Sequence, residues 1–341
     1  MEGLHEGPRG PNEVHDTIPR VKATSRKEQV TQETNAPAPL ATPRVLGTPE
    51  CIWPAAADLG EGTLWSAREQ ALYWIDILQP RLFRYDPATG AQRTWHFDEE
   101  ITAIAERASA TGLFLTLRRG FALFDTTAPG DTTKPRYLHQ PEPERTGNRF
   151  NDGKCDSRGR FWAGSMDFDC KAPTGALYRF DADGRCTRHD DGFEVTNGPT
   201  WSGDGRTMYF NNTAINKLYA YDFDMDAGAV SNRREWHRFP KGDGLPDGMT
   251  TDAAGRLWIA HWDGACVTCH DPVNAAELAR IALPVSNVTD CAFGGPDLRT
   301  LYISTARNSR TEEQLQSEPL AGGLFSVRID SPGIPAALFA G

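Results

Sequence analysis

The sequence predicts an all-β fold: a six-bladed β-propeller with a disordered N-terminal extension. Three observations predict it. A pattern of paired strands recurs six times along the chain, the apolar runs have the length of strands with no long helical stripe between them, and the first part of the chain contains no aromatic residue.

The N-terminal part differs in composition from the rest. Residues 1–48 contain no Phe, Trp or Tyr, and their six Lys or Arg balance six Asp or Glu. Such a segment cannot bury enough apolar surface to offset the entropy lost on ordering it. We therefore expect a disordered extension over residues 1–48 and one propeller domain over residues 49–341.

Each repeat contains a short apolar strand, a polar turn and a second strand that often ends in an aromatic residue and Asp. Successive repeats begin 41–49 residues apart, a spacing typical of propeller blades. The first apolar residues of the six copies are Leu72, Leu113, Phe161, Met208, Leu257 and Leu301. A propeller ring must also be closed, and we expect residues near Glu50–Trp53 to pair with the last copy.

Polar residues precede these strands at matched offsets. Five copies place a carboxylate or carboxamide 10 or 11 residues before the first apolar residue, whereas the second copy offers only Thr102; the five are Glu61, Asn151, Asn197, Asp247 and Asp290. The innermost strand of each blade lines the channel, so equivalent positions converge on its axis. The alternative is that these Asn and Asp residues, several of which precede Gly, only form turns.

Converging carboxylates repel one another and lose solvation, and a cation resolves both costs. Oxygen ligands favour one hard divalent ion such as Ca²⁺, Mg²⁺ or Mn²⁺, and leave Zn²⁺ or Fe²⁺ open. The sequence therefore predicts a divalent metal ion in the channel.

Five motifs resemble the regucalcin/gluconolactonase family, also called the senescence marker protein family. They occur in the family's order between about Cys51 and the C-terminus: Leu59-Gly-Glu-Gly-Thr-Leu-Trp65, Arg149-Phe-Asn-Asp-Gly-Lys154, Asn197-Gly-Pro-Thr-Trp201, Pro246-Asp-Gly-Met249 and Phe293-Gly-Gly295. The resemblance implies a six-bladed propeller that hydrolyses sugar lactones with one divalent metal ion on its axis.

The resemblance also implies roles for individual residues. Glu61, Asn197 and Asp247 would bind the metal ion. Arg149 and Asn151 would contact substrate oxygens, and Asp169 occupies the place of a substrate-binding Glu in animal members. Asp290 departs from the small polar residue expected there, so it either supports the ligands from behind or changes the charge of the site.

These residues suit the opening of aldono-1,4- or 1,5-lactones such as glucono-, xylono- or arabinonolactone. The metal ion would polarise the carbonyl, and Asp247 would be the general base that takes a proton from water. His261 either faces the channel, where it could move a proton, or packs within its blade. Asp152 and Lys154 are expected to form a turn or a salt bridge within a blade.

Other functions are less favoured. The net charge of −10 argues against a nucleic-acid partner, no apolar run reaches membrane-spanning length, and no Gly-x-Ser-x-Gly or phosphate-binding loop occurs. Seven cysteines without an export signal indicate free thiols in the cytoplasm. We expect a monomer; the alternatives are a calcium-binding, regucalcin-like propeller without catalysis, and a broader lactonase or arylesterase.

Overall fold

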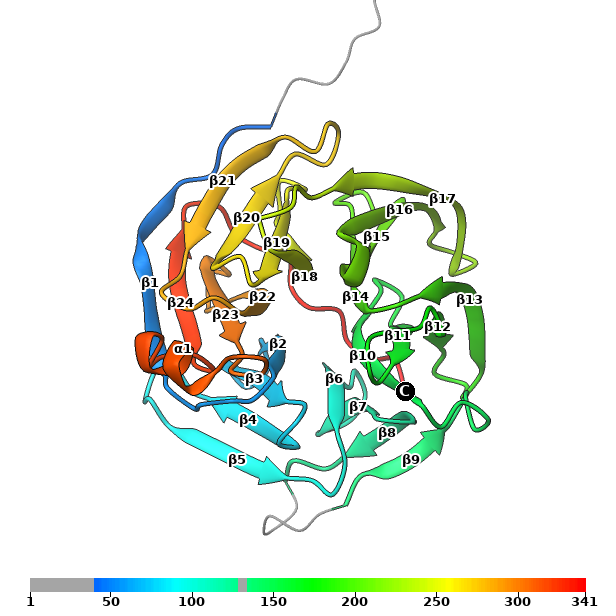
Figure 1. The fold of residues 1–341 in the computed structure, drawn as a ribbon. Coiled ribbons are helices and arrows are strands. Elements are labelled where there is room, and N and C mark those ends of the chain that lie inside the picture. The colour runs from blue at the N-terminus through cyan, green and yellow to red at the C-terminus, as the bar shows by residue number, and fades with distance from the viewer. Residues whose placement is uncertain (1–39, 128–133) are drawn as a thin grey trace, which may run out of the picture. The chain divides into compact units, whose positions relative to one another are not determined.

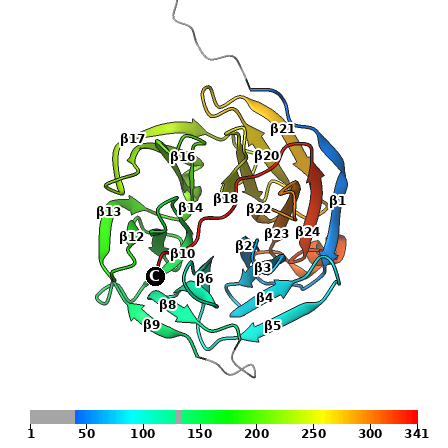
Figure 2. The same ribbon diagram turned by 180° about the vertical axis from the view of Figure 1, so that it is seen from behind.

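The computed structural model describes residues 40–127 and 134–341. They form six four-stranded antiparallel sheets, arranged as blades around a central channel (Figures 1 and 2). The predicted six-bladed propeller is thus confirmed. The predicted N-terminal extension lies outside the described residues as far as residue 39.

Each blade runs from an inner strand at the channel to an outer strand at the rim. Blade 1 contains β2 (Gly60–Ser66), β3 (Ala71–Asp76), β4 (Arg81–Tyr85) and β5 (Gln92–His96); blade 2 contains β6 (Ile101–Glu106), β7 (Leu113–Leu117), β8 (Gly120–Phe124) and β9 (Arg136–His139); blade 3 contains β10 (Asn148–Cys155), β11 (Phe161–Asp167), β12 (Gly175–Phe180) and β13 (Cys186–Phe193). Blade 4 contains β14 (Thr196–Trp201), β15 (Thr207–Asn212), β16 (Lys217–Asp224) and β17 (Ala229–Arg238); blade 5 contains β18 (Leu245–Thr251), β19 (Leu257–Trp262), β20 (Cys266–His270) and β21 (Glu277–Ala282); blade 6 contains β22 (Val288–Gly294), β23 (Thr300–Thr305), β24 (Leu324–Ile329) and β1 (Val45–Trp53).

The described residues include only short helical segments. They are the 3₁₀ turn η1 (Thr213–Ile215) and the helix α1 (Glu312–Ser317). Thr311 caps α1, because its hydroxyl accepts the N–H of Gln314 while the Gln314 side chain accepts the N–H of Thr311. No helix among the described residues is long and apolar enough to cross a membrane.

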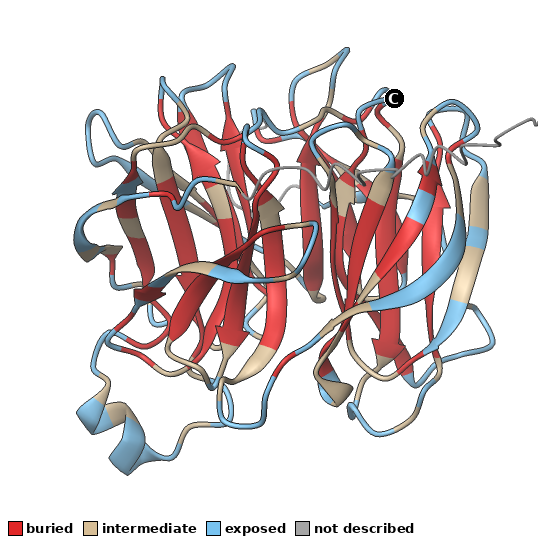
Figure 3. Cartoon of the chain, turned by 90° about the horizontal axis from the view of Figure 1, so that it is seen from above, coloured by how far each residue is buried: buried red, intermediate tan, exposed pale blue. Residues whose placement is uncertain are grey.

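The apolar runs in the sequence are strands covered on both faces. β2, β3, β6 and β7 are buried along their whole length, whereas the outer strand β17 is mostly exposed (Figure 3). In the described part of the chain, six clusters of buried apolar side chains fill the spaces between the blades. One cluster lies between each blade and the next. Packing between blades therefore fixes the positions of the inner strands.

The ring closes as predicted. Cys51 and Trp53 on β1 pair with Phe325 and Leu324 on β24, so a segment from the start of the described chain completes the last blade. β1 begins at Val45, four residues before the expected domain start at residue 49. Val45 pairs with Ile329 and packs against the apolar cluster between blades 5 and 6. The expected boundary was based on the absence of aromatic residues, so it did not include this aliphatic contact.

The C-terminal segment crosses one end of the channel. The Gly333 N–H donates to the Leu298 carbonyl at 2.8 Å, and the Phe339 N–H donates to the Glu106 carbonyl at 2.8 Å. Phe339 also packs on Phe114 with ring centroids 4.0 Å apart. The segment therefore runs from blade 6 to blade 2, and Figure 2 shows it passing across the middle of the ring.

Candidate active site

The predicted channel residues lie near the start of the inner strands, at one end of the channel. Every inner strand carries a register shift at this level; the shifts fall at Glu61/Leu64, Ile101/Ala103, Phe150/Gly153, Asn197/Thr200, Pro246/Met249 and Val288/Asp290. Bulges of this kind break the alternation of side chains and turn polar groups toward a common point. The positions that the repeat predicts to be equivalent therefore also share a register shift in the backbone.

Two asparagines form a buried hydrogen-bond chain between blades 3 and 4. Asn151 Nδ2 donates to Asn197 Oδ1 at 2.8 Å and to the Thr196 carbonyl at 2.6 Å. Asn197 Nδ2 donates in turn to the Thr213 hydroxyl at 2.8 Å, and that hydroxyl donates to the Pro246 carbonyl at 2.7 Å. This series of hydrogen bonds thus ends at the residue before Asp247.

Arg149 begins this hydrogen-bond chain. Its side chain is buried, and Nη1 donates to Asn151 Oδ1 at 2.5 Å and to the Phe150 carbonyl at 3.0 Å. Burial lowers the pKa of the guanidinium, against the effect of nearby groups that include Glu61 and Asp247. A guanidinium has five N–H donors, so Arg149 keeps donors for a ligand at this end of the channel.

Glu61 and Asp247 are buried carboxylates with few partners. Each is 5% exposed, and within the described residues the hydrogen bonds to their carboxylates come from the backbone N–H groups of Gly62 and Gly248. Burial raises the pKa of both carboxyls well above the ordinary value, and neighbouring carboxylates raise it further. Both groups therefore favour a proton or a cation.

Asp152, beside Asn151, is a further buried carboxylate that faces blade 4. It accepts the N–H of Gly153 at 2.6 Å and the N–H of Gly198 at 2.7 Å. Burial raises the pKa of this carboxyl to about 6, although Lys154 acts in the opposite direction. The register shift in β10 explains why two successive side chains both reach the neighbouring blade.

Lys154 differs from the expected salt bridge within a blade. Its ammonium lies 3.5 Å from Asp290 Oδ1 and donates to the Met249 carbonyl, so it leaves blade 3 and reaches blades 5 and 6. Asp290 Oδ2 accepts the N–H and the hydroxyl of Thr63 at 2.8 and 2.7 Å. The expectation of a salt bridge within a blade was wrong because a long side chain at the channel can cross it.

Two other predicted residues lie apart from these contacts. His261 is fully buried in blade 5, where Nε2 lies 2.6 Å from the Thr268 hydroxyl and the ring packs on Phe239; burial lowers the pKa of the imidazole to about 3. Asp169 lies in the loop after β11, its side chain is 68% exposed, and it pairs with Lys171. His261 thus packs within its blade, which was one of its two predicted positions. Asp169 does not lie beside the buried carboxylates.

The chemistry of the channel residues fits a divalent cation. Two buried carboxylates lack side-chain donors, and the amide oxygen of Asn211 is also buried without a donor among the described residues. Asn211 lies next to Asp247, since its Nδ2 donates to the Asp247 carbonyl at 2.6 Å. No group of three or more His, Cys, Asp or Glu side chains suited to a metal ion occurs in the described ranges, so any metal site here depends on amide oxygens as well.

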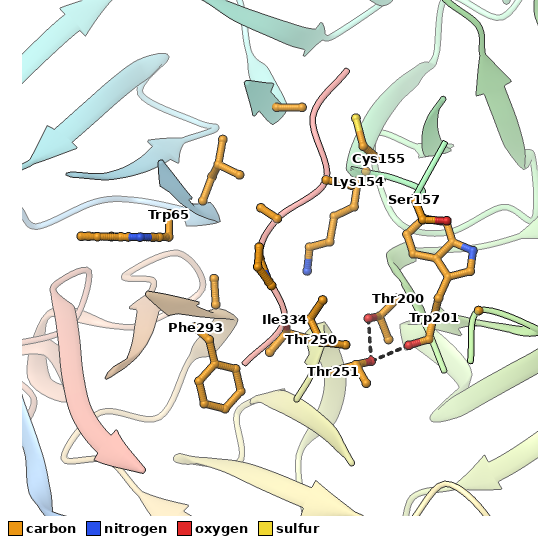
Figure 4. Close-up of a pocket in the computed structure, with 18 of the residues that line it drawn as sticks. Trp65, Lys154, Cys155, Ser157, Thr200, Trp201, Thr250, Thr251, Phe293 and Ile334 are labelled. Atoms are coloured by element: carbon orange, nitrogen blue, oxygen red, sulfur yellow. Dashed lines mark hydrogen bonds between the residues drawn. The ribbon is translucent and has the colours of Figure 1, made fainter. Parts of the chain in front are cut away.

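A cavity of about 330 Å³ lies farther along the same channel, toward the end that the C-terminal segment crosses (Figure 4). Its walls include Trp65, Trp201, Phe293 and Ile334. Asp152 and Lys154 line it as well, whereas Glu61, Asn197 and Asp247 do not. The lining of the cavity therefore includes the buried carboxylate of Asp152 but none of the three residues predicted to bind the metal ion.

Comparison with known proteins gives matches over most of the chain. The family model described as SMP-30/Gluconolactonase/LRE-like region matches residues 59–307, a range that contains every predicted site residue. The 6-deoxy-6-sulfogluconolactonase of Pseudomonas putida is 39% identical over 295 residues, covering 86% of this chain and 99% of its own. The pentonolactonase XacC of Haloferax volcanii is 37% identical over 283 residues, covering 81% of this chain and 93% of its own.

A solved structure has the same architecture. The calcium-binding protein regucalcin of Agrobacterium tumefaciens strain C58 matches with a TM-score of 0.80 and 25% sequence identity. The match covers 86% of this chain and 99% of that protein.

Proposed function

Because the chain belongs to the SMP-30/gluconolactonase/LRE-like family, we propose that it is a lactonase that hydrolyses sugar lactones to aldonic acids with the help of one divalent metal ion. Relatives that carry the names of a gluconolactonase and a pentonolactonase support this class of substrate. The proposed substrates are aldono-1,4- and 1,5-lactones.

One observation carries the proposal. Glu61 and Asp247 are buried in the channel with few hydrogen-bond donors, beside a chain of amides that begins at an arginine. A scaffold without a ligand would gain nothing from such carboxylates, because desolvation and mutual repulsion oppose their ionisation. A bound cation offsets both effects.

Glu61, Asn197 and Asp247 would hold the ion, with Asn151 beside them. When bound, a divalent cation supplies a Lewis acid for the carbonyl oxygen of the lactone. The hydrogen bond from Asn151 Nδ2 to Asn197 Oδ1 orients the amide oxygen of Asn197, and Asn211 supports the backbone of Asp247.

Asp247 acts as the general base. A carboxylate with one oxygen on the metal ion keeps its second oxygen free, so it can accept a proton from water as the oxygen of that water attacks the carbonyl carbon. The bond between the carbonyl carbon and the ring oxygen then breaks. The proton passes from Asp247 to the released ring oxygen, which leaves a carboxylic acid and a hydroxyl group.

Arg149 and Asn151 bind the sugar. Free N–H donors of the guanidinium can bind hydroxyl groups or the ring oxygen, and the bond to Asn151 fixes the plane of the guanidinium. Polar groups of this kind favour a sugar lactone over an aryl ester, which needs an apolar mouth. Asp169 stays a predicted substrate contact from the exposed loop after β11.

We also expect a cytoplasmic monomer. The seven cysteines all lie in the described part of the chain and form no disulfide with one another, as a reducing compartment would favour.

Proton release tests the proposed activity. Metal-stripped protein would be assayed on a panel of aldonolactones and on phenyl acetate, with Mg²⁺, Ca²⁺, Mn²⁺, Zn²⁺ or Fe²⁺ added back singly. We expect turnover of aldonolactones only after a metal ion is added, and little turnover of the ester. Protein that binds a metal ion but turns over neither class of substrate would point to the calcium-binding alternative.

A further inference from the structure

We infer that Lys154 and Asp290 form a largely buried ion pair that spans the channel beneath the candidate metal site. The pair holds the strands of this site in place and contributes to the net charge around a bound divalent cation. Both are positioning residues, since neither is placed against the substrate. The inference rests on the proposed function, because it concerns the same site.

The pair joins opposite sides of the ring. Lys154 belongs to β10 of blade 3 and Asp290 to β22 of blade 6, with Nζ 3.5 Å from Oδ1. The Asp290 side chain is fully buried, and that of Lys154 is 24% exposed. Lys154 extends into the channel, where it lines the cavity together with Asp152 (Figure 4).

The ion pair contacts residues that lie two positions after two of the proposed metal ligands. Asp290 accepts two hydrogen bonds from Thr63, which follows Glu61 by two residues, and Lys154 donates to the carbonyl of Met249, which follows Asp247 by two residues. Gly248 presses against Asp290 so closely that a Cβ there would lie 2.3 Å from Oδ1. Movement of the pair would therefore shift the strands that carry Glu61 and Asp247.

The pair also matters for the charge of the channel. Four carboxylates and two cationic side chains are buried or partly buried here; they are Glu61, Asp152, Asp247 and Asp290, with Arg149 and Lys154. When all are ionised, two negative charges remain, which one divalent cation neutralises. Loss of Asp290 would leave the bound site with a net positive charge, and loss of Lys154 would leave it with a net negative charge.

Calorimetric titration with Mn²⁺ tests this arrangement. Metal-stripped full-length protein would be compared with Asp290→Asn, Lys154→Met and the double variant. We expect Asp290→Asn to weaken Mn²⁺ binding about tenfold or more, and Lys154→Met to tighten it, since the two changes alter the charge in opposite directions. The double variant keeps the net charge but lacks the pair that positions the strands, so its Kd should recover part of the loss seen in Asp290→Asn and stay weaker than the original. This variant also serves as the second measurement if Lys154→Met fails to fold.

The matched control is Asp252→Asn. Asp252 is fully buried and paired with Arg256 at 2.7 Å, but it lies at the turn after β18, outside the channel cluster. We expect this variant to lower the melting temperature and leave the Kd for Mn²⁺ unchanged. If Asp290→Asn behaves like this control, the inference is wrong and the proposed function stands. If the original protein binds none of the five ions of the activity assay, the metal site and the inference both fail.

Discussion

Asp247 has two tasks in the proposed reaction, since one carboxylate serves as a metal ligand and as a base. Replacement by Asn keeps the shape of the side chain and removes its basicity. We expect Asp247→Asn to lower kcat on aldonolactones by about 10²–10⁴-fold, the usual contribution of a general base. Its melting temperature in the absence of metal should stay equal or rise, because a buried carboxylate with raised pKa is lost.

Steady-state proton release and thermal melting would check both parts. Asp98→Asn is a suitable control, because Asp98 is 82% exposed and pairs with Lys134 at the surface. Undiminished turnover by Asp247→Asn would exclude Asp247 as the base.

The pKa shifts of the channel carboxyls predict the pH dependence of stability. Asp152 titrates at about 6 in the folded protein, and Glu61 and Asp247 titrate well above their ordinary values. A carboxyl with a raised pKa binds protons more tightly in the folded state than in the unfolded state. Its contribution therefore stabilises the folded protein as the pH falls through the folded pKa toward the unfolded value of about 4.

We accordingly expect the stabilisation by Mn²⁺ to be greater at pH 7 than at pH 5, because protons compete with the ion at the lower pH. Melting of stripped and Mn²⁺-loaded protein at both values would measure this difference. Equal stabilisation at the two pH values would show that these carboxyls do not bind the ion.

Sequence reasoning found some of these residues and missed others for a physical reason. Glu61, Asn197 and Asp247 were found because the repeat places them at matched offsets. The contacts of Asp152 and Lys154 with other blades were not predicted, because strict alternation along β10 would point Asn151 and Asp152 to opposite faces. The register shift at this point appears only once β10 is paired with β11.

At the scale of an element, the register shift in β18 includes a residue without a side chain. Gly248 follows Asp247 at the register shift, and its backbone packs against Asp290. We expect Gly248→Ala to force β18 and β22 apart, with a loss of about 1–3 kcal/mol in the free energy of unfolding and weaker metal binding.

Gly147→Ala is the matched control for this change. A Cβ at Gly147 would meet no atom within 4 Å, and its φ is not in the left-handed region. Chemical denaturation of both variants would separate the close approach from a general effect of replacing glycine. A Gly248→Ala protein as stable as Gly147→Ala would show that β22 can move aside.

At the scale of the whole molecule, the ring depends on β1. The first described contacts of the chain start at Leu40, whose N–H donates to Asp271, and β1 begins at Val45. We expect deletion of residues 1–39 to leave the melting temperature and activity almost unchanged, and deletion of residues 1–53 to prevent folding or cause aggregation. Calorimetry and size-exclusion chromatography would compare the two. A stable, active protein without residues 1–53 would mean that five complete blades and an open sixth suffice.

The sequence predicted the number of blades and the closing segment well, because each depends on a repeated apolar pattern or on the need to close a ring. Glu50–Trp53 does pair with the last blade. The start of β1 and the path of residues 333–339 across the channel were not predicted, since both depend on backbone hydrogen bonds and contacts distant in sequence, such as Phe339 with Phe114.

Ring closure has a consequence for the making of this protein. A ribosome releases β1 first among the strands and its partner β24 last, and the ion pair beside them joins Arg44 and Asp330 across 286 positions. While synthesis proceeds, β1 has no partner and its edge stays open to other chains. A product that stalls before β24 cannot close, so it would be left to chaperones and proteases. Only a chain that has been synthesised through β24 can therefore complete the sixth blade and close the ring.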